Sequence, residues 1–309
     1  MKYKIGTRAS KLSLAQTNWV VSELKKTTDS EYDIMTITTR GDADSRVLFA
    51  IDQKGIFEKE IDKAVADKRV DFGVHSLKDI PSVLPPGLVL ACIPKRETVN
   101  DVIISENGSD LDSIKPEGIV GTSSLRRAVQ IMRKRPDLNV RPIRGNIETR
   151  IQKISDNYDA IVLAQAGITR LKLDVKYSKL SIDDFLPSPG QGALGIVARK
   201  DDTQTIQMLK KIEDSESRLE IEAERALSNY VESGCRFPVG SYARINDNNM
   251  TIKTAAFSVD GKKSITLAKT GPRNDPQTLG KLAGEELEKQ GVQELALNWR
   301  QKVEEWNKK

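Results

Sequence analysis

The sequence predicts two α/β domains with mostly parallel sheets, followed by a smaller α+β domain with an antiparallel sheet. Over roughly the first two thirds of the chain, short β-branched apolar runs alternate with helix-like segments, the pattern of a parallel sheet covered by helices. At 309 residues the chain is also longer than a single core commonly supports. After about Asp214 the pattern changes to several strands joined by short turns, which predicts the third domain.

Four strands and two helices are predicted for the first domain. The first helix is indicated by Leu14, Thr17, Val21 and Leu24, which follow one another at three- or four-residue steps and so share one face. The segment 39–57 lacks a sustained period, and we expect a lid over residues 41–55. In chain order the elements are a strand and loop at 3–10, a helix at 12–26, a strand at 32–39, a helix at 55–68 and strands at 71–76 and 87–94.

The second domain is predicted to repeat this plan. The loops 6–10 and 121–124 each follow a strand and open a helix. This similarity indicates two related halves, or it reflects the common use of Gly, Ser and Thr at such turns. The elements are a strand and loop at 118–123, a helix at 125–135, a strand and loop at 138–145, a helix at 146–155 and a strand at 159–167.

The third domain is predicted to hold a helix at 217–232, strands at 237–245, 250–260 and 263–271, and a closing helix at 276–291. The Pro/Gly-rich segment 183–202 is expected to return the chain to the first domain, with hinges near Pro94–Arg96 and Gly190–Gly195. We therefore expect domain 1 at 1–96 plus 193–213, domain 2 at 97–192 and domain 3 at 214–309.

Composition argues against several classes of protein. No run of about 18 apolar residues is present, so no membrane span is expected. The first residues lack the apolar region of a signal peptide, and Cys92 lies in a run typical of a buried strand; we therefore expect a cytoplasmic protein without disulfides. One histidine and two separated cysteines form no recognisable metal site.

Basic residues concentrate between Gly121 and Arg150, where seven arginines and one lysine face only two acids. Arg126 and Arg127 fall in the first turn of a predicted helix, which is already positive, so a bound anion would explain them. The carboxyl ends of strands line one crevice in α/β folds. We expect five arginines to converge there on carboxylates: Arg8, Arg126, Arg127, Arg144 and Arg150.

A small bound anion does not account for every basic residue of this segment. Ordinary solvated side chains are favoured for Arg133, Lys134 and Arg135, because cations are stabilised at helix C-termini. A nucleic-acid partner is not expected, because the net charge is only +5, aromatic residues are few and no binding motif is recognisable. A polycarboxylate fits better.

Two further residues are candidates for chemistry. Asp79 follows a predicted strand beside Lys78, where it could stabilise a developing cation or pass a proton to a leaving amine; alternatively it caps a turn. Cys235 lies in a loop between Gly234 and Arg236, and a neighbouring cation favours the nucleophilic thiolate. The alternative is a buried, inert cysteine.

Eight segments, spread in order over almost the whole chain, share a common pattern. They are GTRASKLSLAQ (6–16), KGIFEKE (54–60), HSLKDIP (75–81), GTSSLRR (121–127), RGNIETR (144–150), DAIVLAQAGITRL (159–171), PSPGQGALGI (187–196) and GCRFPVGSYA (234–243). Together they resemble the hydroxymethylbilane synthase family, also called porphobilinogen deaminases.

The resemblance implies a transferase of porphyrin, or heme, biosynthesis. Such enzymes condense four porphobilinogen molecules head to tail, release ammonia, and hydrolyse the product to hydroxymethylbilane. It implies a dipyrromethane cofactor joined by a thioether to Cys235, and Asp79 as the catalytic residue. It also implies two domains resembling periplasmic binding proteins, plus a third that carries the cysteine.

The same matching implies the remaining site residues. Those expected to hold the cofactor and growing chain are Lys78, Ser124, Arg126, Arg127, Arg144 and Arg150. Those expected near the substrate are Arg8, Ser10, Phe57, Arg170 and Gln191. The chain departs from the family pattern at Ser233, and at Asp52 and Gln53, where glycines are usual; this concerns loop geometry and lid mobility.

A non-catalytic two-lobed binding protein for a small polycarboxylate is the main alternative, because it would explain the arginines and the hinge. It would need neither Cys235 nor Asp79. We expect a monomer. The sequence leaves open whether the product passes directly to uroporphyrinogen III synthase, the family's next enzyme.

Overall fold

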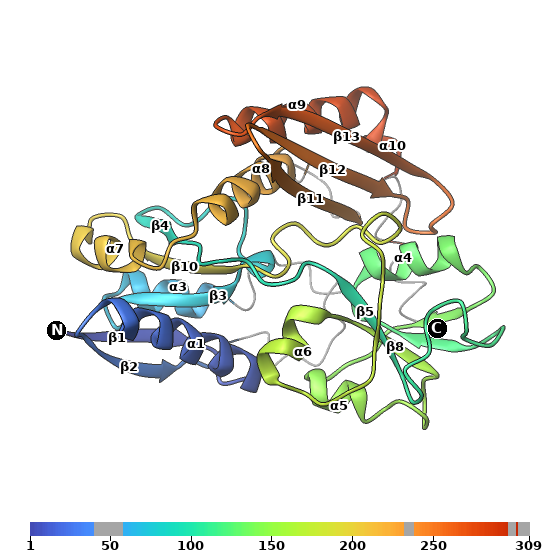
Figure 1. Ribbon diagram of the computed structural model, residues 1–309, viewed down its shortest axis with the longest axis horizontal. Coiled ribbons are helices and arrows are strands. Elements are labelled where there is room, and N and C mark those ends of the chain that lie inside the picture. The colour runs from blue at the N-terminus through green and yellow to red at the C-terminus, as the bar shows by residue number, and fades with distance from the viewer. Residues whose placement is uncertain (40–57, 232–237, 296–300, 302–309) are drawn as a thin grey trace. The chain divides into compact units, whose positions relative to one another are not determined.

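The computed structural model describes residues 1–39, 58–231, 238–295 and 301 (Figure 1). Their contacts divide them into two compact units. Unit 1 comprises residues 1–39, 58–97 and 190–218, and unit 2 comprises residues 98–189, 219–231, 238–295 and 301. The predicted lid at 41–55, Phe57 and Cys235 lie outside the described residues.

Unit 1 is built on a five-stranded sheet with the order β2-β1-β3-β10-β4. β1 pairs in parallel with β2 and β3, whereas β10 runs antiparallel to β3 and β4. β10 is the strand by which the chain returns to unit 1. The strands are β1 (Lys2–Thr7), β2 (Glu31–Thr36), β3 (Phe72–Ser76), β4 (Leu88–Cys92) and β10 (Leu194–Arg199).

Helices cover both faces of this sheet. Val20 and Leu24 of α1 (Lys11–Thr27) and Met208 and Leu209 of α7 (Thr203–Lys210) share one core cluster with Ile5 and Phe72. On the other face, α3 (Lys59–Ala66) lies close above two glycines, since a Cβ on Gly73 would come within 2.7 Å of Ile61. This close approach decides where α3 sits on β3.

The first sheet of unit 2 repeats the same plan, with the order β7-β6-β8-β5-β9. β6 pairs in parallel with β7 and β8, and β5 runs antiparallel to β8 and β9. The two loops that the sequence relates therefore occupy equivalent places, after β1 and after β6. The strands are β5 (Asp101–Ser105), β6 (Ile119–Gly121), β7 (Asn139–Arg141), β8 (Ala160–Ala164) and β9 (Ser178–Lys179).

Three short helices follow the parallel strands of this sheet: α4 (Leu125–Lys134), α5 (Ile147–Ile151) and α6 (Gln165–Leu171). The strand predicted over 159–167 is wrong in its second half, because β8 ends at Ala164 and α6 begins at Gln165. No turn residue separates them, and Ala164 provides no side-chain cap to mark the boundary. The helix predicted to 155 ends at Ile151.

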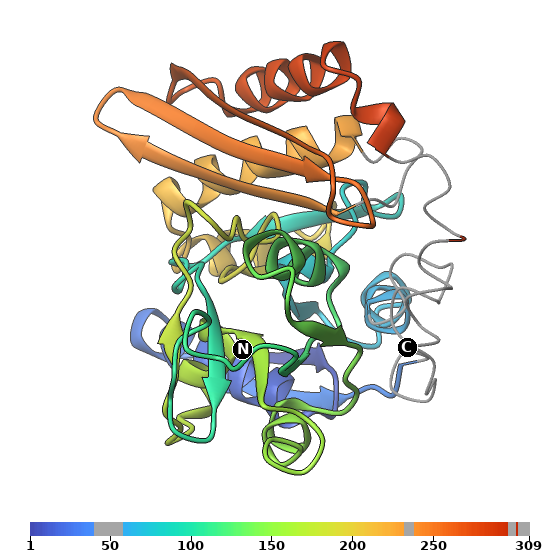
Figure 2. The same ribbon diagram turned by 90° about the vertical axis from the view of Figure 1, so that its right-hand side faces the viewer.

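The rest of unit 2 is an antiparallel sheet of β11 (Val239–Asn246), β12 (Asn249–Phe257) and β13 (Ser264–Pro272). α8 (Ser215–Val231) and α9 (Pro276–Lys289) pack on one of its faces, and Figure 2 shows α9 running alongside the sheet. The short α10 (Val292–Leu295) completes this core. Ala255 and Phe257, on the other face, pack with Val129 of α4.

The predicted fold class, α/β followed by α+β, is confirmed: two five-stranded sheets covered by helices, and a small antiparallel sheet with its own helices. The division into three domains at 96/97, 192/193 and 213/214 stays a prediction. Each of these two sheets contains one antiparallel strand in its interior, β10 or β5, which agrees with the predicted mostly parallel sheets, although β5 itself was not among the predicted strands.

Candidate active site

In unit 1, Asp79 lies on a short turn that follows β3 directly. Leu77–Asp79 form a single 3₁₀ turn. Lys78 and Asp79 are exposed, while Leu77 and Ile80 on either side are buried. The amide of Leu77 donates a hydrogen bond to the carbonyl of Ala193 at 3.0 Å, and the amide of Ile80 donates to Leu77 at 3.0 Å. The carboxylate is therefore presented to solvent on an anchored backbone.

Gly190 packs closely against the backbone of this turn. Its φ of +76° is disfavoured for residues with a side chain, and a Cβ there would lie 2.4 Å from Cδ2 of Leu77 and 3.2 Å from the amide nitrogen of Lys78. The next residue, Gln191, is buried, and its carbonyl accepts a hydrogen bond from Nε of Arg96 at 2.9 Å. Residues 190–193 thus fix the backbone that carries Lys78 and Asp79.

The loop after β1 meets the same edge of the sheet. β1 and β3 are parallel, so Arg8 and Ser10 follow one strand end and Lys78 and Asp79 follow the other. Ser10 caps α1, with its Oγ accepting a hydrogen bond from the amide of Ser13 at 3.2 Å. These four predicted site residues therefore share one edge of the sheet in unit 1.

In unit 2, the two arginines at the start of α4 are buried and bonded to a carboxylate that the sequence analysis did not anticipate. Arg126 and Arg127 are each 6% exposed, and Asp101, the first residue of β5, is fully buried. Nη2 of Arg126 lies 2.7 Å from Oδ2 of Asp101. Nη2 and Nε of Arg127 lie 2.8 and 3.0 Å from Oδ1.

The charges of this triad do not cancel. Burial would raise the pKa of Asp101, but the charges and hydrogen bonds of Arg126 and Arg127 outweigh burial and hold that pKa below its ordinary value. Burial also lowers the pKa of Arg126, despite the attraction of Asp101. Two guanidinium groups and one carboxylate leave a net charge of about +1 at the amino end of α4. An internal anion therefore explains in part why α4 begins with two arginines.

Further arginines gather near this triad. Arg150 of α5 is half-buried, and its Nε donates to the carbonyl of Gly145 at 2.7 Å. Burial first, and then the charges of Arg127 and Arg144, lower the pKa of Arg150 to about 10. Arg127, Arg144 and Arg150 therefore lie near enough to repel one another; we call them the arginine cluster. Such a cluster is relieved when an anion binds.

The other basic and polar residues singled out in unit 2 lie outside the arginine cluster. Oγ of Ser124 accepts from the amide of Arg127 and caps α4. Arg170 lies half-buried in the last turn of α6. For Arg135, the expectation of a solvated side chain is wrong. Its guanidinium pairs with Asp137 at 2.6 Å and donates to three carbonyls in the 111–114 segment, which ties that segment to the end of α4.

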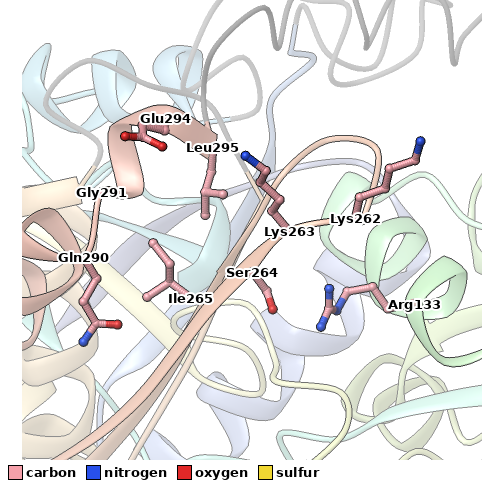
Figure 3. A pocket seen from close by; sticks show the side chains of 9 residues that line it. All are labelled: Arg133, Lys262, Lys263, Ser264, Ile265, Gln290, Gly291, Glu294 and Leu295. Carbon is pink, nitrogen blue, oxygen red and sulfur yellow. The ribbon is translucent and has the colours of Figure 1, made fainter.

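A cavity of about 450 Å³ lies elsewhere in unit 2, and none of the predicted site residues lines it (Figure 3). Arg133, Lys262 and Lys263 contribute positive charge and Glu294 a negative one. Arg133 joins α4 to the β12–β13 hairpin, since its Nη1 donates to the carbonyl of Gly261 at 3.0 Å and its guanidinium lies 5.8 Å from the ring centre of Phe257. These contacts assign Arg133 a structural part.

Half-buried and buried arginines at the edge of one α/β sheet, and an exposed carboxylate at the edge of another, are typical of α/β proteins that bind anionic ligands. Residues 3–207 match the family described as "Porphobilinogen deaminase, dipyromethane cofactor binding domain", and residues 218–289 match "Porphobilinogen deaminase, C-terminal domain". The chain belongs to the porphobilinogen deaminase family.

Similar proteins span the full length. A probable porphobilinogen deaminase of Nitrosopumilus maritimus is 70% identical, with 100% of both chains covered. A porphobilinogen deaminase of Brevibacillus brevis is 44% identical, covering 94% of this chain and 95% of its own. Among solved structures, an ancestral cationic amino acid solute-binding protein matches with a TM-score of 0.41 and 13% identity, covering 68% of this chain and 87% of its own.

Membership of this family makes the chain a transferase of tetrapyrrole biosynthesis, a hydroxymethylbilane synthase that uses porphobilinogen and a dipyrromethane cofactor. The predicted activity and cofactor are thereby confirmed. Within the described residues, no helix has the length and apolarity needed to cross a membrane, and no group of three His, Cys, Asp or Glu side chains is arranged to hold a metal ion.

Sequence reasoning missed Asp101 and the pairing of His75 with Asp62 of α3. Asp101 opens the strand DVIIS, and an acid in front of three apolar residues was the only local signal of a buried carboxylate. His75 and Asp62 are 13 positions apart on different elements, and no spacing rule connects a strand to a helix on its face.

Proposed function

We propose that Asp79 is the catalytic carboxylate of this hydroxymethylbilane synthase. The observation that carries the proposal is the turn at 77–79, which exposes Asp79 beside Lys78 while burying the residues on both sides. An exposed acid on an anchored turn, at the strand edge where Arg8 and Ser10 also lie, suits a group that acts on a bound substrate.

The role proposed for Asp79 is electrostatic. When the amine leaves porphobilinogen as ammonia, positive charge develops on the pyrrole ring, and a fixed carboxylate at hydrogen-bond distance from the ring nitrogen stabilises it. The same carboxylate then faces the cationic ring formed after carbon–carbon bond formation. Removing a single such group costs about 10²- to 10³-fold in rate. Arg8, Ser10 and Lys78 are proposed to bind the substrate's carboxylates at this edge.

The residues of unit 2 fit a dipyrromethane. This cofactor carries carboxylates, and the lowered pKa of Arg150 reflects burial and two neighbouring cations, which a bound carboxylate would offset. When bound, the cofactor supplies the free pyrrole carbon onto which substrate units are added. Arg144, Arg150 and Arg127 are proposed to hold its carboxylates and those of the growing chain, with Arg170 nearby. Cys235 is proposed as the attachment point.

Several predicted residues are assigned positioning parts. Arg126 and Ser124 are proposed to act through Arg127, the first by sharing Asp101 and the second by capping the helix on which Arg127 sits. Gln191, being buried behind the Asp79 turn, is proposed to shape that turn. Phe57 is proposed to stack near the substrate. The alternative of a non-catalytic binding protein is not favoured, because the family to which the chain belongs consists of transferases.

The finer setting of the enzyme is also a proposal. We infer a cytoplasmic monomer, which passes hydroxymethylbilane on to uroporphyrinogen III synthase. Analytical ultracentrifugation of the purified chain, alone and mixed with that enzyme, tests the monomer and the contact between the two enzymes. Sedimentation of the chain as a dimer would contradict the first statement, and the absence of a complex at high concentration would contradict direct transfer of the product.

The catalytic proposal is tested by Asp79→Ala and Asp79→Asn in single-turnover reactions. Purified enzyme is mixed with porphobilinogen, and ammonia release and the protein's intact mass are followed in time. We expect both variants to retain the covalent cofactor but to lose ammonia release by about 10²-fold or more. Lys78→Met serves as a neighbouring control, because it should weaken substrate binding more than the chemical step. Unchanged rates in both Asp79 variants would end the proposal.

A further inference from the structure

The only histidine of the chain is buried against a carboxylate on the face of unit 1 that α3 covers. Nε2 of His75 lies 3.2 Å from Oδ1 of Asp62, and each side chain is 4% exposed. Within the described residues, neither of these two atoms has a hydrogen-bond partner, so the 3.2 Å approach to the other is the polar contact that each of them makes. The two atoms therefore depend on each other, since burying either group alone is costly.

The surrounding backbone is shaped around the imidazole. Gly73, two residues earlier on β3, lies on the same face, and a Cβ there would come within 2.9 Å of Nε2 of His75 and 2.7 Å of Ile61. The absence of a side chain at Gly73 thus leaves room for both the ring and the helix. α3 reaches β3 closely enough for Asp62 to meet His75 only because this position is glycine.

His75 is close to the catalytic turn along the chain. β3 ends at Ser76, and the turn begins at Leu77. Successive strand residues point to opposite faces. Ser76 is held by Gln16 of α1, whose Nε2 donates to its Oγ at 2.9 Å, and His75 is held by Asp62 of α3. The last two residues of β3 are therefore fixed from both sides by polar contacts to different helices.

Stability alone gives little reason for this pair. Buried ion pairs are often replaced by apolar residues of similar volume without loss of stability. A polar pair specifies one arrangement of strand and helix, whereas apolar side chains slide more easily. A displacement of about 1 Å in a catalytic group is enough to cost about 10²-fold in rate.

We propose that His75 and Asp62 are positioning residues, which fix the end of β3 against α3 and so hold the turn that places Asp79 against the substrate. This inference rests on the proposed catalytic role of Asp79. Neither residue touches the substrate. Their contribution is expected in the rate of ammonia release rather than in substrate binding.

The test compares an apolar and a conservative replacement of each partner. His75→Leu and Asp62→Leu should each lower kcat about 10-fold or more while KM changes less than about threefold. Intact mass should still show the covalent cofactor, and Tm should fall no further than in Thr205→Val, a buried polar control on the opposite face of the sheet. His75→Gln, which keeps an N–H donor, should recover most of kcat.

Double variants distinguish a positioning role from a general loss of structure. The double variant His75→Leu with Asp62→Leu should lose no more kcat than either single variant, because one contact is lost in all three. In an Asp79→Ala background, His75→Leu should cause no further loss. Three results would overturn the inference. They are a double variant whose loss of kcat is the product of the two single losses, a His75→Gln variant as slow as His75→Leu, and rates that fall in proportion to cofactor content. An Asp79→Ala enzyme with normal rates would instead refute the catalytic role of Asp79 itself.

Discussion

Replacing Asp101 by asparagine tests the charge balance at the start of α4. The substitution keeps the size of the side chain but removes the only negative charge of a fully buried triad, so that two guanidinium groups face each other uncompensated. Removing one partner from a buried ion pair costs about 3 to 5 kcal/mol. The asparagine oxygen still accepts a hydrogen bond, so we expect about 3 kcal/mol of lost stability.

The hydrogen bonds within the triad predict which substitution costs the most stability. Asp101 accepts one hydrogen bond from Arg126 and two from Arg127. Arg126→Met leaves a neutral pair of Asp101 and Arg127, and should cost about 1 to 3 kcal/mol, less than Asp101→Asn. Asp184→Asn is the matched control, because Asp184 pairs with Lys134 at 2.9 Å in solvent and such exposed pairs contribute at most about 1 kcal/mol.

The assay is urea unfolding, with hydrogen exchange of β5 and α4 peptides as a local readout, since a chain with more than one unit does not unfold in a single step.

The pKa of Asp101 is lowered in the folded state, so its stabilisation is present above the unfolded pKa of about 4 and is lost as pH falls through the lower folded value. The difference between wild type and Asp101→Asn should therefore shrink below about pH 4. A variant as stable as wild type at pH 7, or a difference that grows in acid, would refute this reasoning.

Two further changes probe the two halves of the site. Gly190→Ala should lower kcat about 10-fold or more while the cofactor is retained, because its Cβ would lie 2.4 Å from Leu77 and φ is +76°; a fully active variant in steady-state assays would contradict the tight contact. Arg150→Met, made in cofactor-free Cys235→Ser protein, should raise the free energy of unfolding by about 1 kcal/mol at pH 7, since the lowered pKa of Arg150 means that its charge opposes folding there; this gain should begin to shrink as pH rises through about 10. Denaturant unfolding measures this, and a loss of stability would show that Arg150 is not repelled by its neighbours.

Local patterns carried most of the fold. Helix starts at Lys11 and Leu125 follow serine caps, and the strands ending at Thr7 and Ser76 follow from short apolar runs. Strand order in parallel sheets then brings loops to one edge, which is why Arg8 could be placed at a strand end from the sequence. The predicted convergence of Arg8 with the arginines of unit 2 stays a prediction. Strand β5 was missed, because nothing in DVIIS distinguishes an antiparallel insertion from a connecting segment.

Long-range polar pairing was not predictable from one sequence. Arg126 and Arg127 look like free ligand-binding cations until Asp101, 25 and 26 residues earlier, is found between them. Arg135 looks like a solvated helix-end cation, yet it holds the 111–114 segment. In both cases the deciding partner lies on another element, where local periodicity carries no information.

The most direct test of the whole account is the intact mass of the purified chain and of its Cys235→Ser variant, before and after a brief exposure to porphobilinogen. We predict that the wild type carries the mass of one covalent dipyrromethane and then gains whole substrate units in steps. The serine variant should show neither. A bare wild-type chain that never gains mass, or identical increments on the variant, would contradict chain growth on a primer anchored at residue 235.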